Sequence, residues 1–191
     1  MDYESIQNLH AGDHFNFKGL EWVVLDPDKE GGVLAITADI WKRDVPFSQE
    51  YFEGCNNWRT STIRDDLHCL MNKIGADNLL PHTVDLVADN GDKLYGTMDE
   101  MVFLLTCDEY RKYRDVMPRY DIWIWTCTPW ITTNTGNAYT VRRVTSDGSL
   151  NNTGYGAGSG GGGVAPACIF NPQNLKLRRQ AQFVESPTQD D

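Results

Sequence analysis

Residues 122–126 are Ile-Trp-Ile-Trp-Thr, a run of β-branched and aromatic side chains that favours an extended strand. Two more runs of this type follow, Tyr-Thr-Val-Arg-Arg-Val at 139–144 and Val-Ala-Pro-Ala-Cys-Ile-Phe at 164–170. Turn-forming Asn, Gly and Pro residues separate the three runs. The C-terminal third of the chain is therefore predicted to consist of strands joined by loops.

Strands are also predicted nearer the N-terminus. Apolar side chains alternate along residues 13–26 around Lys18-Gly19, a pattern typical of a hairpin, and residues 33–38 add a further strand. The short apolar runs at 84–87 and 101–106 are additional candidates for strands.

Two segments have the spacing of helices. In residues 60–74 the apolar side chains lie on one helical face and acidic residues lie on the other. Thr60 or Ser61 can cap the start of this helix, and Gly75 can end it. Residues 108–116 are predicted to form a brief second helix. Two helices among short, mostly antiparallel strands and long irregular loops make an α+β domain.

Length and charge limit the classes of function. The chain has 191 residues, of which 40% are hydrophobic, and these values fit one domain that buries a hydrophobic core. A net charge of -10 argues against nucleic acid as a partner, because phosphate binding needs clustered Lys and Arg. The first ten residues carry acids and no apolar run, so we expect no signal peptide, no membrane span and synthesis that ends in the cytosol.

The cysteines do not form a disulfide or metal-binding pattern. Their number is odd and no CxxC pair occurs, so free thiols are expected. His68-Cys69 has no second ligand pair at a suitable spacing, and we therefore expect neither a metal ion nor another cofactor. The five cysteines are Cys55, Cys69, Cys107, Cys127 and Cys168.

No arrangement for catalysis is recognisable. The four histidines all lie in the first half of the chain, outside any nucleophile motif. The glycine run at 160–163 lacks the Lys-Ser/Thr end of a phosphate loop and does not open a helix. The sequence therefore predicts that the protein is not an enzyme.

Residues 151–163, Asn-Asn-Thr-Gly-Tyr-Gly-Ala-Gly-Ser-Gly-Gly-Gly-Gly, have the composition of a flexible linker. The apolar run at 164–170 follows at once and must return to the core, and too little chain remains for a second domain. We interpret 151–163 as a long surface loop between strands, ordered only where the fold or a partner holds it.

Residues 130–155 are rich in Thr, Asn and Tyr, a mixture that resembles the contact loops of antibodies. Tyr139 and Tyr155 are the expected anchors, because aromatic contacts tend to dominate binding energy. Alternation sets Val141 on the opposite side of the strand from Thr140, and a bulge or an inward salt bridge would reverse the side on which Arg143 lies. The residues predicted to share one exposed ligand-binding surface are Trp130, Asn134, Asn137, Tyr139, Thr140, Arg143, Thr145, Asn151, Asn152, Thr153 and Tyr155.

Several segments resemble a known family. Residues 123–129, 141–150 and 163–172 resemble the end of the variable proteins encoded by bacterial and phage diversity-generating retroelements. Residues 57–64 and 102–106 are similar to earlier landmarks of the same domain. The resemblance implies a C-type-lectin-like fold and a reverse transcriptase that rewrites adenines, so that selected C-terminal surface positions vary.

This resemblance sets the expected organisation. It implies an N-terminal segment at 1–12, a C-type-lectin-like domain at 13–172 with a displayed variable face at 130–163, and a C-terminal tail at 173–191. Adenine changes in an Asn codon cannot produce Trp, so the resemblance implies that Trp123, Trp125 and Trp130 belong to the fixed scaffold. Trp58, Trp123 and Trp125 also lie within apolar patterns and are expected to be buried.

The expected function is recognition of an unknown protein or surface ligand by a diversified surface. One alternative is an enzyme like the formylglycine-generating oxidases of the same broad fold, which requires a redox or metal centre built from cysteines. Another alternative is a structural module of a phage or cell surface. The ligand, the oligomeric state and carriage on a virion are open at this point.

Overall fold

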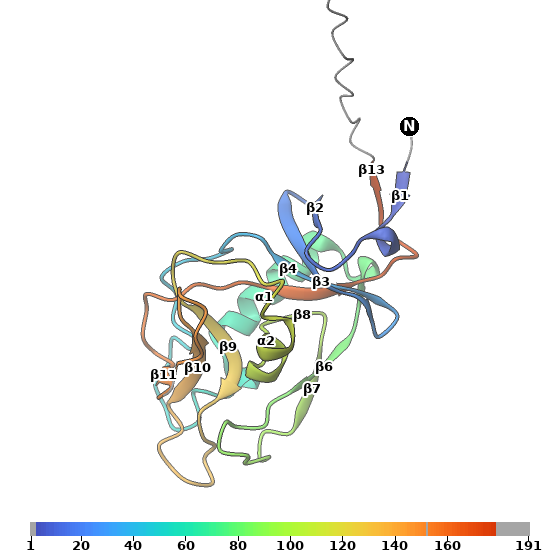
Figure 1. The fold of residues 1–191 in the computed structure, drawn as a ribbon. Helices are drawn as coiled ribbons and strands as arrows, with labels where there is room; N and C mark the ends of the chain where they lie inside the picture. Colours follow the sequence, from blue (N-terminus) through green and yellow to red (C-terminus); the bar gives the residue numbers. More distant parts are fainter. Residues whose placement is uncertain (1–2, 152, 179–191) are drawn as a thin grey trace, which may run out of the picture.

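The computed structural model describes residues 3–151 and 153–178 and has the α+β architecture expected from the sequence. All named strand pairs are antiparallel, and the described strands form four sheets (Figure 1). The strands are β1 (Tyr3–Ser5), β2 (His14–Phe17), β3 (Leu20–Lys29), β4 (Gly32–Thr37), β5 (Leu79–Leu80), β6 (His82–Asp85), β7 (Thr97–Glu100), β8 (Val102–Phe103), β9 (Ile124–Pro129), β10 (Thr140–Val144), β11 (Tyr155–Gly156), β12 (Ala167–Phe170) and β13 (Lys176–Arg178). The helices are α1 (Thr62–Ile74), α2 (Cys107–Tyr113) and the 3-10 turns η1 (Ile6–Asn8), η2 (Trp58–Thr60) and η3 (Ala76–Asn78).

The main sheet has the strand order β2-β3-β4-β12-β5, and β8 also pairs with β12. Its first hairpin is confirmed: Lys18 and Gly19 both have positive φ, as the tight turn between β2 and β3 requires. Phe170 of β12 makes edge-to-face contacts with Phe15 and Trp22, at centroid distances of 5.2 and 5.0 Å. The C-terminal strand thereby closes the core of the N-terminal hairpin.

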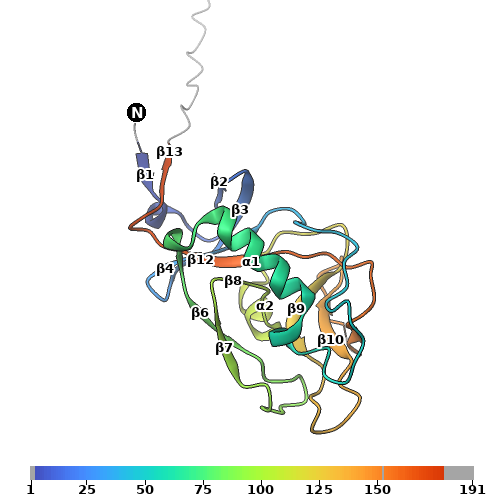
Figure 2. The same ribbon diagram turned by 180° about the vertical axis from the view of Figure 1, so that it is seen from behind.

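Helix α1 matches the prediction. The Ser61 side chain accepts a hydrogen bond from the Arg64 backbone N–H, and Gly75 ends the helix with a φ of 91°. Its apolar face is buried against β8 and η2. Helix α2 lies nearer the viewer in Figure 1, and helix α1 lies nearer the viewer in Figure 2.

Helix α2 ends earlier than the predicted range of 108–116. Thr106 caps it, and the Glu109 carboxylate bonds back to the Thr106 backbone N–H in a capping box. The helix ends at Tyr113, whose side chain packs into the core, and turns follow it.

Several strand bounds differ from those predicted. Of residues 101–106 only β8 pairs, because the following residues lead into the cap of α2. Of residues 84–87 only the first two lie in a strand, β6, which begins earlier at His82. Residues 164–166 are buried but lie before β12, in which pairing begins after Pro166.

A separate three-stranded sheet, β9-β10-β11, lies at the opposite end of the molecule from β1 and β13 (Figures 1 and 2). In its register Val141 is opposite both Pro129 and Tyr155, whereas Arg143 is opposite Trp125. The register shift between Val141 and Arg143 is a bulge on the β9 side. In β10 itself, Arg142 is buried and the adjacent Arg143 is partly exposed.

Segments that flank the predicted domain of 13–172 also join the fold. Strands β1 and β13 pair with each other, and the side chains of Ile6 and Leu175 are buried in the common core. The packed region therefore extends beyond both predicted bounds. The predicted site residue Asn152 and the final residues of the predicted tail lie outside the described residues.

The tryptophans expected to be scaffold differ in burial. Trp58 and Trp125 are fully buried, and each indole N–H has a partner, respectively Glu100 Oε1 at 3.1 Å and the Val45 carbonyl at 3.0 Å. Trp123 is only partly buried, so the expectation holds fully for two of the three. Within residues 3–151 and 153–178, the helices are too short and too polar to cross a membrane.

Candidate binding surface

The glycine-rich loop after β10 is held by the fold over much of its length. Backbone hydrogen bonds run from Gly163 N to the Trp123 carbonyl (2.8 Å) and from Trp125 N to the Gly163 carbonyl (3.1 Å). Gly162 packs directly on the Trp123 ring, where an added Cβ would lie 2.2 Å from ring carbons. Glycine is needed here because only a residue without a side chain allows this close approach.

The guanidinium of Arg143 lies against two aromatic rings that contact each other at a centroid distance of 4.9 Å. Its carbon atom is 4.0 Å from the centroid of the Tyr155 ring and 4.8 Å from that of Trp123. Contacts of a cation with aromatic faces at such distances are attractive. We call Trp123, Arg143 and Tyr155 the arginine sandwich. Its residues come from the segment before β9, from β10 and from β11.

A second aromatic group lies at the surface nearby. The rings of Tyr51 and Tyr139 are stacked, with centroids 4.8 Å apart and planes 15° apart. Tyr51 is 69% exposed and the adjacent Phe52 is 42% exposed, which is unusual for large apolar side chains. We call Tyr51 and Tyr139 the tyrosine stack.

Glu53 fixes the inner ring of the tyrosine stack. Its carboxylate accepts a hydrogen bond from the Ala138 backbone N–H at 3.1 Å. The Tyr139 hydroxyl, and then this backbone N–H, lower the pKa of Glu53, while the same carboxylate raises the pKa of Tyr139. The stack therefore has an acidic group at one edge and an open face on Tyr51.

A short segment, residues 155–158, connects the two aromatic groups. It begins at Tyr155 of the arginine sandwich, and the Ala157 N–H bonds to the carbonyl of Tyr139 at 2.7 Å. At its end, an added Cβ on Gly158 would lie 3.3 Å from Cδ2 of Tyr51. Strand alternation places Tyr139 on the same side of β10 as Val141, which is opposite Tyr155.

The opposite side of this small sheet carries another part of the predicted set. Trp130 and Thr140 both approach Gly154, where an added Cβ would lie 3.2 Å from the Cβ of either residue. The buried Arg142 lies over the Trp130 ring at 5.2 Å and reaches Asp89 at 3.5 Å. The Arg142 side chain therefore links the loop that contains Asp89 to the sheet.

The other predicted residues form turns. Asn134 donates from Nδ2 to Asp92 at 3.2 Å, and Asn137 is exposed with a φ of 61°. Thr145 bonds to the Ser149 carbonyl at 2.8 Å. Asn151 accepts from the backbone N–H of Thr153, also at 2.8 Å.

The predicted residues therefore do not share one surface, in contrast to the prediction from the sequence. Tyr139, Arg143 and Tyr155 lie on one side of the sheet, whereas Trp130 and Thr140 lie on the other. The physical reason is the two-residue period of a strand, which places neighbouring residues of β10 on opposite sides of the sheet. None of the ten predicted residues that the structure describes is fully buried.

Sequence reasoning missed the residues that complete the tyrosine stack. Tyr51, Phe52 and Glu53 lie before η2, in a segment without regular secondary structure, and were not among the predicted contacts. Two adjacent aromatic residues in a polar, irregular segment are a weak signal of exposure, since one side chain of such a pair often packs inward.

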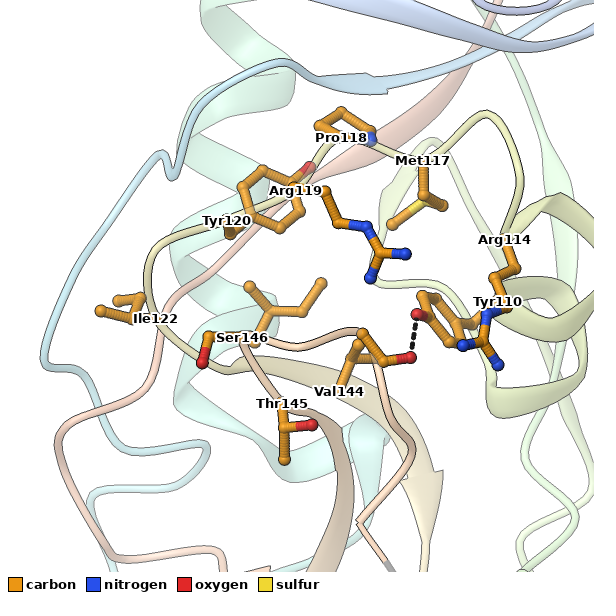
Figure 3. Close-up of a pocket in the computed structure, with 12 residues that line it drawn as sticks. Tyr110, Arg114, Met117, Pro118, Arg119, Tyr120, Ile122, Val144, Thr145 and Ser146 are labelled. Carbon is orange, nitrogen blue, oxygen red and sulfur yellow. Dashed lines mark hydrogen bonds between the residues drawn. The ribbon is translucent and has the colours of Figure 1, made fainter.

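Figure 3 shows a pocket between α2 and the turn after β10, where the Arg119 side chain extends into the opening. Tyr110 donates to the Gly148 carbonyl at 2.6 Å across it, and Arg119 donates to the Asp147 carbonyl at 2.9 Å. The free space is about 10 Å³, enough for about one water molecule. Thr145 lines this pocket, but the pocket cannot enclose a metabolite.

The cysteines of the core are poorly suited to redox or nucleophilic chemistry. Burial raises the pKa of Cys127 and of Cys168 well above that of a free thiol. The Cys127 thiol donates to the Leu104 carbonyl at 3.0 Å, and all five cysteines are free. In the described part of the chain, no three His, Cys, Asp or Glu side chains are grouped to hold a metal ion.

No protein-family model matches the chain, and no solved structure matches it significantly.

Proposed function

We propose that this protein recognises a ligand through the tyrosine stack and the arginine sandwich. The observation that carries the proposal is the exposed Tyr51 ring, stacked on Tyr139 and left open on its outer face. Rigid, exposed aromatic rings provide large contact areas at low cost in conformational entropy. The partly exposed Arg143 adds a positive charge beside the ring of Tyr155.

The proposal includes a C-type-lectin-like fold and membership in the variable proteins of diversity-generating retroelements. Two helices, short antiparallel strands and long irregular loops support the fold. Residues 131–139 and 151–163 contain only amino acids that adenine changes in an Asn codon can produce, which supports diversification. Tyr51 lies far upstream and would be a fixed partner of the variable Tyr139.

The proposal also holds that the protein is not an enzyme. Two buried cysteine thiols with raised pKa values and a pocket the size of one water molecule support this view. Recognition on an open surface needs neither a cavity nor an activated nucleophile.

A glycan and peptide array, probed with the labelled protein, tests the proposed surface. The matched variants are Tyr51→Ala, which removes the open ring, and Leu94→Ala, which removes another exposed apolar side chain at a different place. We expect spots bound by the wild type to lose at least about tenfold in affinity with Tyr51→Ala, as for a binding hot spot. Leu94→Ala should bind like the wild type, and equal losses in both variants would contradict the proposal.

The neighbouring DNA tests diversification independently of binding. We expect a near-copy of the codons for the C-terminal segment beside a reverse transcriptase gene, with mismatches mainly at adenines. If that copy is missing, the proposal of diversification fails, whereas binding through the tyrosine stack can still be measured.

A further inference from the structure

The guanidinium of Arg143 has no hydrogen-bond or ion-pair partner among the described residues. Its Nε atom is buried without a partner, and the side chain as a whole is partly exposed. The chain contains 27 acidic and only 17 basic residues, so carboxylates for pairing are abundant. An unpaired cation in such a chain requires a reason, because leaving a buried donor unsatisfied costs free energy.

Several other arginines are paired with carboxylates. Arg64 bonds to Glu100, and the buried Arg142 reaches Asp89. Close to the arginine sandwich, the Asp121 carboxylate is bound to Arg43 at 2.8 Å. The carboxylate that lies closest to Trp123 in the sequence is thus paired with another cation.

Two aromatic rings hold the guanidinium of Arg143 in place. Its carbon is 4.8 Å from the ring centroid of Trp123 and 4.0 Å from that of Tyr155, and the two rings contact each other at 4.9 Å. The rings are themselves braced, because Trp123 packs on Gly162 and meets Trp125 edge-on at 4.7 Å. A guanidinium held in this way loses little entropy when its fork of donors meets an acceptor.

We propose that Arg143 binds a carboxylate of the ligand, an inference that rests on the proposed binding function. A planar, singly charged carboxylate matches the donor fork of arginine in two parallel hydrogen bonds. A net charge of -10 disfavours polyanions such as nucleic acids, whose many charges the whole protein would repel. The ligand class is therefore a sugar acid or an acidic amino-acid side chain.

The test uses two pairs of small probes in an NMR titration. Glucuronate is compared with glucose, and N-acetylglutamic acid amide with N-acetylglutamine amide, so that each pair differs in one carboxylate. The Nε–Hε signal of Arg143 is assigned by its disappearance in the variant Arg143→Lys. We expect an acidic probe to shift this signal and to bind about tenfold more tightly than its neutral counterpart, as charge-assisted hydrogen bonds require. Whichever acid binds identifies the source of the carboxylate.

Two variants distinguish the effect of the arginine donor fork on binding from the effects of its charge and of folding. Arg143→Gln should abolish the preference for the acidic probe, whereas Arg143→Lys should keep part of it through its charge. Thermal unfolding shows that each variant is folded, and the lysine variant remains informative if the glutamine variant unfolds. Equal binding of acidic and neutral probes, or an acid preference that survives in Arg143→Gln, would overturn the inference.

The array experiment distinguishes a failure of this inference from a failure of the proposed function. If array ligands bind and require Tyr51 but bind equally to Arg143→Gln, recognition by the tyrosine stack stands and the carboxylate site falls. If the carboxylate probes bind through Arg143 and the array signals do not depend on Tyr51, the carboxylate site stands and the tyrosine stack falls.

Discussion

The main sheet and the three-stranded sheet are stabilised in different ways. Every side chain of β4 and β12 is buried, and nearly all of them are apolar. In β10 the buried positions alternate irregularly with partly exposed ones, and two arginines lie at its centre, while both residues of β11 are partly exposed. Apolar burial dominates in β4 and β12. In the three-stranded sheet β9 is also buried throughout, but β10 and β11 depend on close approaches of glycine and on contacts between rings and cations.

This difference explains why the second sheet can display side chains. Thr126 donates to the Arg142 carbonyl at 2.8 Å, and the Thr128 hydroxyl accepts from the Cys107 N–H at 2.9 Å. These bonds fix β9 without a continuous apolar face. The side of β10 that carries Arg143 is then free to hold partly exposed groups, as a rigid binding surface requires.

The largest loss of stability is expected from Trp58→Ala. The substitution leaves a large cavity beside Phe47 and removes the indole partner of the buried Glu100 carboxylate. We expect a loss of about 3–5 kcal/mol in the free energy of unfolding, measured by urea denaturation. Trp58→Phe, which keeps most of the volume, should lose clearly less. Similar losses in the two variants would show that packing is not the cause.

Gly162→Ala tests the three-stranded sheet through its backbone contact. The new Cβ would lie 2.2 Å from the Trp123 ring, so the ring must move and the arginine sandwich must open. We expect a loss of about 1–3 kcal/mol, as for overpacking of a core. Gly160→Ala is the control, because its Cβ would meet only the Asp44 carbonyl at 3.5 Å. A stable Gly162→Ala variant would mean that the loop does not hold Trp123.

The sequence predicted the parts of the fold that local patterns determine. The turn at Lys18-Gly19 and helix α1 with its Ser61 cap follow from neighbouring residues alone. Strand β7, with the polar sequence Thr-Met-Asp-Glu, was missed because its pairing with β6 uses backbone groups that every residue carries. The start of β9 was also misplaced, since Trp123 instead bonds to the glycine loop.

The binding surface was predictable only in part. Tyr139, Arg143 and Tyr155 stand out by residue type within a polar segment, and all three contribute to the candidate surface. The stacking of Tyr51 on Tyr139 depends on how two distant loops meet, which no local pattern contains. The division of Thr140 and Arg143 between two sides of the sheet follows from alternation along one strand, whereas the place of Tyr155 depends on register, which is non-local.

A pH-dependent effect is expected at His82, which lies beside the main sheet. Its Nε2 is 2.6 Å from Glu109, and its Nδ1 is 3.2 Å from Glu30, which also pairs with Lys29. Burial alone would lower the pKa of His82, but the hydrogen bonds and charges of Glu109 and Glu30 raise it overall. The stabilisation by charged His82 is therefore complete below the unfolded pKa of about 6.5 and is lost as pH rises through the folded value.

Urea denaturation of the wild type and of His82→Gln between about pH 5.5 and pH 8 measures this effect. The difference in free energy of unfolding should be largest at the acidic end and should shrink as the pH rises. His10→Gln is the matched control, because that side chain is 87% exposed and contributes little to packing. A difference that grows with pH would show that His82 is neutral in the folded protein.

The smallest change in stability is expected from Tyr51→Ala, although this variant should lose the most binding. The side chain is 69% exposed and its single close aromatic neighbour is Tyr139 among the described residues, so the free energy of unfolding should change by no more than about 0.5 kcal/mol. Tyr139 should keep its position, because Glu53 and the backbone of Ala157 still hold it. Thermal denaturation and binding to array ligands are measured on the same preparation. A folded Tyr51→Ala variant that keeps full binding would contradict the proposed role of the tyrosine stack, because the ligand would then bind without Tyr51. A variant that loses both stability and binding would instead assign Tyr51 to the scaffold.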